Sequence, residues 1–139
     1  MRKLIVAVIC FALVSLAVRV DEPIISSDVD IVTLYLDSAS SNCERITVSY
    51  EQYLNEYLSS GRVFGVCVER VDENFAIDIV ERLSARPVFE EKLSGTVTKY
   101  YYSTKIPFYK RVNGKKVNLQ VAESFGNFTV ASPLIFGGF

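Results

Sequence analysis

The sequence contains no histidine and no tryptophan among its 139 residues. Histidine is the side chain that most often serves as a general base or a transition-metal ligand, so its absence removes the most frequent sites of both kinds. A serine–histidine pair is excluded for the same reason, and the chain has no Gly-x-Ser-x-Gly motif. Nucleophilic catalysis therefore has no support in the sequence, and we expect neither a cofactor nor a bound metal.

Cysteine is also scarce, with three in the chain. Cys10 lies in an N-terminal apolar run, and the two beyond it are too few for a metal site without histidine. Cys43 follows a polar turn, whereas Cys67 lies between two valines, where a free thiol packs as a small hydrophobic group. A disulfide between Cys43 and Cys67, which an exported protein permits, and two separate thiols both remain open.

The N-terminus has the pattern of a targeting segment. Arg2 and Lys3 precede an unbroken apolar run, and Ser15-Leu16-Ala17 fits a small-x-small cleavage site. We expect a signal peptide over residues 1–17 and an extracytoplasmic, secreted or cell-envelope protein. A spanning helix needs roughly 20 apolar residues, which is more than this run supplies, so the pattern favours a cleaved signal over a membrane anchor. No membrane span is expected after cleavage. The alternative is an uncleaved segment that anchors the chain in a membrane.

Beyond the targeting segment the charges nearly balance. Of the 15 basic residues, Arg2 and Lys3 leave with the segment, so 13 basic and 16 acidic residues remain, with a net charge of −3. This balance gives no bias toward intracellular nucleic acid. Half of the residues are apolar, which is a globular composition. We expect an extended lead-in over 18–29 and one domain over 30–139.

The first half of the domain alternates between strand and helix patterns. Apolar residues at helical spacing predict a helix over 50–58, with Ser49 as its N-cap and Gln52 completing a capping box. A second helix is expected after its N-cap Asp72, and we expect Pro87 to end it. Three stretches have the composition of strands: 30–36, 45–48 and 62–71.

Only strand patterns follow the second helix. They occupy four stretches: 89–107, 109–112, 115–122 and 128–135. Asn113-Gly114 is the strongest short hairpin signal and is expected to join the second stretch to the third. Gly126-Asn127 marks the next turn. The whole order predicts an α+β fold, with an antiparallel sheet of about five to seven strands backed on one face by two helices. We expect the C-terminal strands to be its central part.

The C-terminal strands also resemble a known family. Val-Asn-Leu-Gln-Val-Ala at 117–122, then Phe-Thr-Val at 128–130 and Ser-Pro-Leu-Ile at 132–135 are similar to the YwmB family of exported bacterial proteins. The resemblance covers roughly the last 30 residues. It implies a fold like that of the TATA-box-binding protein. The function of that family is not established, so the resemblance implies no catalytic residues.

One charge feature is uneven. Basic residues interleave with aromatic ones late in the chain, and such a mixture on a sheet can stack rings and hold anions. The candidate ligand-binding residues are Lys99, Tyr101, Lys105, Lys110, Arg111, Lys115 and Lys116. The alternative is that lysines keep strand edges and a hairpin tip soluble. For an exported protein, the matching partner is an anionic polymer of the envelope or another envelope protein.

Two function classes follow from these observations. The leading interpretation is a non-enzymatic binding or interaction domain of the cell envelope. The alternative is a small envelope hydrolase that acts on glycans or phosphoesters through carboxylates, for which Glu90, Glu91 and Glu123 are the candidates. Nothing in the sequence separates these three from ordinary surface acids.

Overall fold

The computed structural model describes residues 23–25, 29–38, 40–59 and 61–136. The expected signal peptide and Cys10 lie outside these residues. The elements in chain order are β1 (Ile31–Leu36), β2 (Glu44–Ser49), α2 (Tyr50–Ser59), β3 (Val63–Val71), α3 (Glu73–Arg82), β4 (Arg86–Leu93), β5 (Thr96–Tyr102), β6 (Lys110–Val112), β7 (Lys115–Val117), β8 (Leu119–Ser124) and β9 (Asn127–Ser132).

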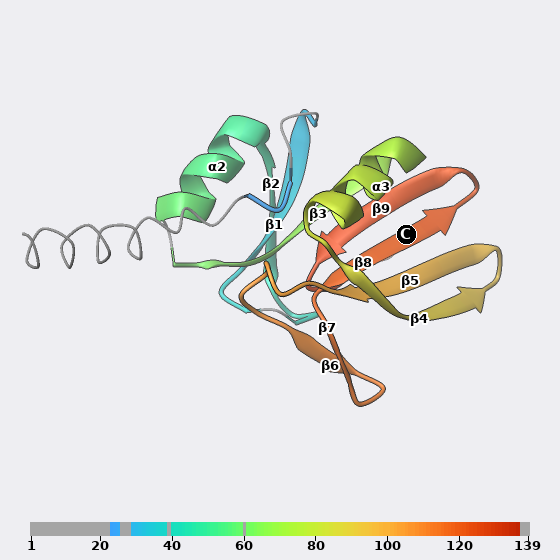
Figure 1. Ribbon diagram of the computed structural model, residues 1–139. Coiled ribbons are helices and arrows are strands. Elements are labelled where there is room, and N and C mark those ends of the chain that lie inside the picture. The colour runs from blue at the N-terminus through green and yellow to red at the C-terminus, as the bar shows by residue number, and fades with distance from the viewer. Residues whose placement is uncertain (1–22, 26–28, 39, 60, 137–139) are drawn as a thin grey trace, which may run out of the picture.

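Seven strands form one antiparallel sheet in the order β2-β1-β3-β9-β8-β5-β4. Figure 1 shows α2 beside the half made by β1, β2 and β3, and α3 beside β9. The expected α+β class with two helices on one sheet face is therefore confirmed, and β9 lies at the middle of the sheet. In the described part of the chain, neither helix is long and apolar enough to cross a bilayer.

Both helices begin where the sequence predicts. The Gln52 amide donates to Ser49 Oγ at 3.3 Å, while the Ser49 amide donates to Gln52 Oε1 at 3.1 Å, which completes the capping box. Asp72 Oδ1 accepts from the Phe75 amide at 2.8 Å and caps α3. The expected end of the second helix is wrong, because α3 stops at Arg82 and Pro87 lies within the edge strand β4, where its missing N–H costs nothing.

The expected strand over 115–122 is also wrong. The Asn113-Gly114 hairpin forms, but β6 and β7 make a separate two-stranded sheet. Asn118 lies between β7 and β8, and its fully buried side-chain amide makes hydrogen bonds to the backbone of the loop after β5. There Asn118 Oδ1 accepts from the Ser103 amide at 2.7 Å and Nδ2 donates to the Ser103 carbonyl at 2.7 Å. The side chain thus replaces strand pairing at the point where the chain leaves one sheet for the other.

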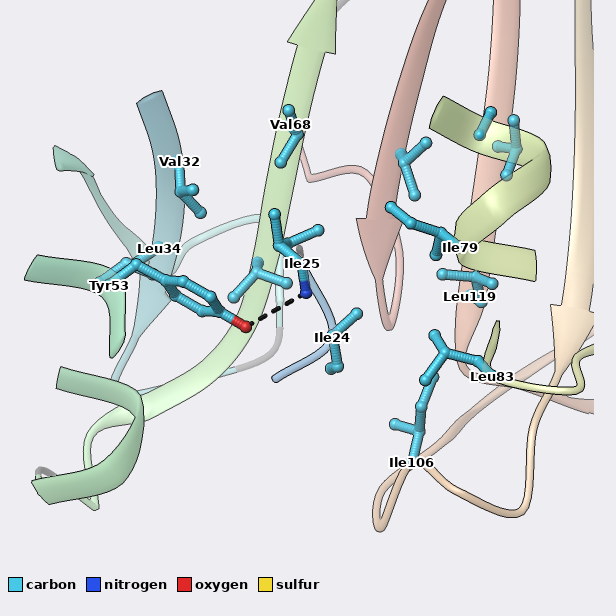
Figure 2. Packing of buried hydrophobic residues seen from close by; sticks show 14 of the residues in the cluster. Ile24, Ile25, Val32, Leu34, Tyr53, Val68, Ile79, Leu83, Ile106 and Leu119 are labelled. Atoms are coloured by element: carbon cyan, nitrogen blue, oxygen red, sulfur yellow. Dashed lines mark hydrogen bonds between the residues drawn. The ribbon is translucent and has the colours of Figure 1, made fainter. Parts of the chain in front are cut away.

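The core lies between the helices and the sheet and begins earlier than expected. Ile24 and Ile25 are 2% and 0% exposed, and Figure 2 shows them between Tyr53 of α2 on one side and Ile79 of α3 on the other. The Ile25 amide donates to the hydroxyl of Tyr53 on α2, and Arg82 on α3 donates to the carbonyl of Ile24. This apolar pair, which lies in the expected lead-in over 18–29, therefore belongs to the core.

The opposite side of the sheet, which we call the helix-free face, is covered at one end by the residues after β9. The Phe136 amide donates to the hydroxyl of Tyr35, and the two rings meet edge to face with centroids 5.0 Å apart. Arg45 donates to the Phe136 carbonyl, and the Ile135 amide donates to Gln120. These contacts hold the described part of the C-terminal tail, up to Phe136, against β1, β2 and β8.

The turn between β8 and β9 carries an unexpected residue. It is Phe125-Gly126 rather than the expected Gly126-Asn127, and Phe125 has a φ of 50° and is 89% exposed. Asn113-Gly114 forms a turn with similar φ values of 51° and 75°, using the residue types that such turns favour. A bulky side chain in this left-handed region costs roughly 1 kcal/mol, which asparagine largely avoids.

We therefore expect Phe125→Asn to raise the free energy of unfolding by about 1 kcal/mol. Urea denaturation followed by circular dichroism measures it, with Phe125→Ala as the control, because alanine removes the ring without relieving the backbone. A Phe125→Asn protein that is no more stable than wild type would show that the turn is not strained.

Candidate binding surface

The β6–β7 hairpin gathers four of the predicted binding residues. Its register pairs Arg111 with Lys116 and Lys110 with Val117, so the cations occupy both faces of the ribbon. Arg111 and Lys116 are exposed on the outer face, whereas Lys110 is half-buried on the inner face beside the buried Val117. Like charges directly opposite one another are unfavourable in an antiparallel pair, so the positive charges of Arg111 and Lys116 repel each other.

Tyr109, the residue just before β6, reduces the cost of this repulsion. Lys116 Nζ lies 4.7 Å from the centroid of the Tyr109 ring, and Arg111 Cζ lies 6.0 Å from it. The negative face of an aromatic ring attracts both cations at these distances. Arg111 also donates to the Gly114 carbonyl at 3.3 Å. The two charges are therefore held in place on the outer face, instead of moving freely in solvent.

A second aromatic contact joins the hairpin to the sheet edge. Phe89 of β4 stacks on Tyr100 of β5, with centroids 4.2 Å apart and an interplanar angle of 17°, and Lys115 Nζ lies 5.9 Å from the Phe89 ring. The Tyr100 hydroxyl donates to Glu91 at 3.1 Å. Burial, with this hydrogen bond, raises the pKa of Tyr100 to about 12, so the phenol stays neutral beside the lysine.

We call this set the hairpin surface. It consists of the four cations of the hairpin and three rings: Lys110, Arg111, Lys115, Lys116, Phe89, Tyr100 and Tyr109. Phe89, Tyr100 and Tyr109 are not among the residues predicted from the sequence. Phe89 lies beside Lys115 only because β4 pairs with β5 in a specific register. No local pattern in the sequence reports that pairing.

Three other predicted residues lie elsewhere. Lys99 and Tyr101 alternate with Tyr100 along β5, so they point to the helix side of the sheet, into a cavity beside α3. Lys105 Nζ donates to the carbonyl of Arg82 at 2.9 Å, at the C-terminal end of α3, where a positive charge favours the helix dipole. The structure therefore divides the predicted site into the hairpin surface and two separate places.

The three candidate carboxylates do not converge. Glu91 lies on the helix-free face, where it accepts from Tyr100. Its neighbour Glu90 points to the helix side, opposite Lys99 in register and 3.3 Å from Lys92 Nζ. Glu123 lines the cavity beside α3. A hydrolytic pair needs two carboxyl groups facing one bond, and these three give no such arrangement around a shared space.

Cys43 and Cys67 are both buried free thiols in the structure. They belong to one small cluster with Tyr35 and Ala131 on the helix-free face. Cys67 lies on β3 and Cys43 just before β2, with β1 between these strands, so two strand spacings of about 4.8 Å separate their positions. A disulfide needs Cα atoms within about 7 Å, so the geometry favours two separate thiols. Burial raises the pKa of the Cys67 thiol to about 11, which keeps it protonated.

Among the residues that the structure describes, no group of three Cys, Asp or Glu side chains is placed to hold a metal ion.

Comparison with known proteins adds no relative. No family model matches the chain, and neither the curated proteins nor the solved structures include a match. The resemblance to the YwmB family and to the TATA-box-binding-protein fold therefore stays a prediction from the C-terminal sequence.

Proposed function

We propose that this protein is an exported, non-enzymatic binding module whose hairpin surface binds an anionic polymer of the cell envelope. The observation that carries the proposal is the pair of cations, Arg111 and Lys116, directly opposite each other and both within 6.0 Å of the Tyr109 ring centroid. The targeting pattern of the first 17 residues supports the compartment.

The energetics of the pair favour an anion as the partner. Two opposed positive charges repel each other in the free protein, at a cost of a few tenths to about 1 kcal/mol. An anion between them turns this repulsion into two attractions, while the Tyr109 ring already holds both groups in position, which lowers the entropy lost on binding. Simple solubilising lysines would need neither the opposed register nor the shared ring.

A polymer suits the surface better than a single small anion. Lys115 pairs with Val112 on the inner face of the ribbon and adds a positive charge at the sheet edge, where it contacts Phe89. Without residues 1–17 the chain has 13 basic and 16 acidic residues and a net charge of −3, so the attraction for an anion is local to this surface. A chain with repeated phosphates can contact Arg111 and Lys116 on the outer face and pass around the hairpin to Lys115 at the sheet edge, and each contact releases condensed counterions.

The test uses poly(glycerol phosphate), a defined polyphosphodiester, as the probe. We expect the double variant Arg111→Gln/Lys116→Gln to bind it roughly tenfold or more weakly than wild type at low salt, because two phosphate contacts and their counterion release are lost. The wild-type affinity should also fall as salt rises, since exposed charges are screened over about 8 Å at physiological ionic strength. Fluorescence anisotropy of labelled polymer measures both effects.

The matched control is Arg70→Gln/Lys92→Gln, which removes two exposed charges away from the hairpin. It should leave the affinity within about a factor of two, since these side chains make no polymer contact and only long-range charge changes. Equal loss in the two double variants would show that only net charge matters and would overturn the proposal. Salt-dependent binding to anionic vesicles but not to the polymer would overturn it as well, because the partner would then be a lipid surface.

A further inference from the structure

A cavity of about 220 Å³ lies on the helix side of the sheet, between α3 and strands β5 and β8. It exists because α3 packs against β9 and leaves the helix side of β5 without a cover (Figure 1). This is the side of the sheet opposite Phe89 and Tyr100, so the cavity is separate from the hairpin surface. It is lined by Glu73, Ala76, Ile77, Val80, Glu81, Val97, Lys99, Tyr101, Val121, Glu123 and Phe128.

The body of the cavity is apolar. Its helical wall includes Ile77, which is 45% exposed although it is a large aliphatic side chain. Its floor is formed by valines of β5 and β8 together with Phe128. A half-exposed isoleucine above an apolar floor leaves unburied apolar surface, so the alkyl part of a ligand placed there is removed from water, which favours binding.

The charges around this apolar body are mainly negative. Glu73 and Glu81 come from the two ends of α3 and Glu123 from β8, whereas Lys99 is the single cation of the lining. Lys99 stands opposite Glu90 in the β4–β5 register, while Glu90 lies 3.3 Å from Lys92 Nζ, so the lining carries three negative side chains and one positive one. Among the described residues, the carboxylates of these three glutamates make no ion pair and no hydrogen bond. The rim is therefore available for an incoming positive group.

We propose that this cavity binds a small lipophilic cation, in which an alkyl or aryl chain fills the apolar body and an ammonium group meets the carboxylates. The volume suits a short chain rather than a full lipid. The charge complementarity selects a cation over an anion, because three carboxylates around a partly desolvated space attract a positive charge and repel a negative one. This site and the anion-binding hairpin surface are independent, so either can fail alone.

Three probes of equal chain length test the selectivity: n-octylammonium, octanoate and 1-octanol. We expect n-octylammonium to shift the amide resonances of α3 and β5 in ¹H–¹⁵N spectra of the protein, and to bind at least tenfold more tightly than octanoate. The variant Glu73→Gln/Glu81→Gln/Glu123→Gln should bind n-octylammonium no better than 1-octanol. A matched control, Glu51→Gln/Glu56→Gln/Asp78→Asn, removes three exposed carboxylates outside the lining and should keep the wild-type preference.

A second variant tests the location. Ile77→Trp places a larger side chain at the half-exposed wall and is expected to weaken all three probes together, since it occupies their space. If this variant does not fold, the charge variants still decide the question. The proposal is overturned if wild-type protein binds octanoate as tightly as n-octylammonium, if no probe shifts α3 or β5 at millimolar concentration, or if the three-glutamate variant keeps the preference for the cation.

Discussion

Gly65→Ala is expected to lower the free energy of unfolding by about 2 to 3 kcal/mol, because the strand passes directly beneath the C-terminal tail. A Cβ atom at this position would lie 2.5 Å from the Ser132 carbonyl oxygen, 2.8 Å from Tyr35 Cδ2 and 2.9 Å from Pro133 Cδ. The nearest of these atoms belongs to the backbone, so it cannot move aside by a simple rotamer change. The added methyl must push the tail away from β3 or distort the sheet.

Gly61→Ala is the matched control, because a Cβ atom there has no neighbour within 4 Å. It should change the free energy of unfolding by no more than about 0.5 kcal/mol. Urea denaturation of both variants, followed by circular dichroism, gives the comparison. If the two variants unfold at the same urea concentration as wild type, then the tail does not pack against β3 as described.

Asn118→Asp is expected to cost about 3 kcal/mol or more, although the two side chains have nearly the same shape. Asn118 is 0% exposed, and its Nδ2 donates to the carbonyls of Ser103 and Ile106 at 2.7 and 3.4 Å. A carboxylate has no hydrogen to donate, so it would place a buried negative charge against two carbonyl oxygens. The hydrogen bond from the Ser103 amide, at 2.7 Å, offsets only part of that cost.

The same variant is expected to loosen the hairpin surface. Asn118 directly follows β7 and ties this end of the hairpin to the loop after β5. Thermal unfolding measures the stability, and amide hydrogen exchange of residues 110–117 measures the loosening. Asn42→Asp, at an exposed turn, makes the same chemical change and should leave both quantities close to wild type. Equal melting temperatures for the two variants would contradict the buried role of Asn118.

The features that the sequence predicts correctly are those set by neighbouring residues. Ser49 with Gln52 and Asp72 mark the two helix starts because a cap acts within one turn. Asn113-Gly114 marks the hairpin because its backbone angles favour those residue types. Alternation of side chains along residues 31–36 is also local: it places Val32, Leu34 and Leu36 in the main core and Tyr35 on the opposite face of the strand.

The features that the sequence misses depend on contacts between distant residues. The alternating pattern from Lys115 to Ala122 is continuous, and only the bond to Ser103 shows that Asn118 interrupts it. The sequence predicts residues 23–25 as part of an extended lead-in, because their burial in the core depends on contacts with both helices that are distant in the sequence. The hairpin surface shows the same dependence on distant contacts. Alternation along β5 predicts that Lys99 and Tyr100 point to opposite faces of the sheet, but it does not predict which face the hairpin contacts.

We propose that, among the described residues, the hairpin surface alone contacts the anionic polymer. Amide chemical-shift mapping of wild-type protein during a titration with poly(glycerol phosphate) tests it most directly. The predicted result is that the largest changes fall on residues 109–117 and on Phe89, and that they vanish at high salt. Changes concentrated on the cavity beside α3 or on the C-terminal tail, or no changes at low salt, would contradict the claim.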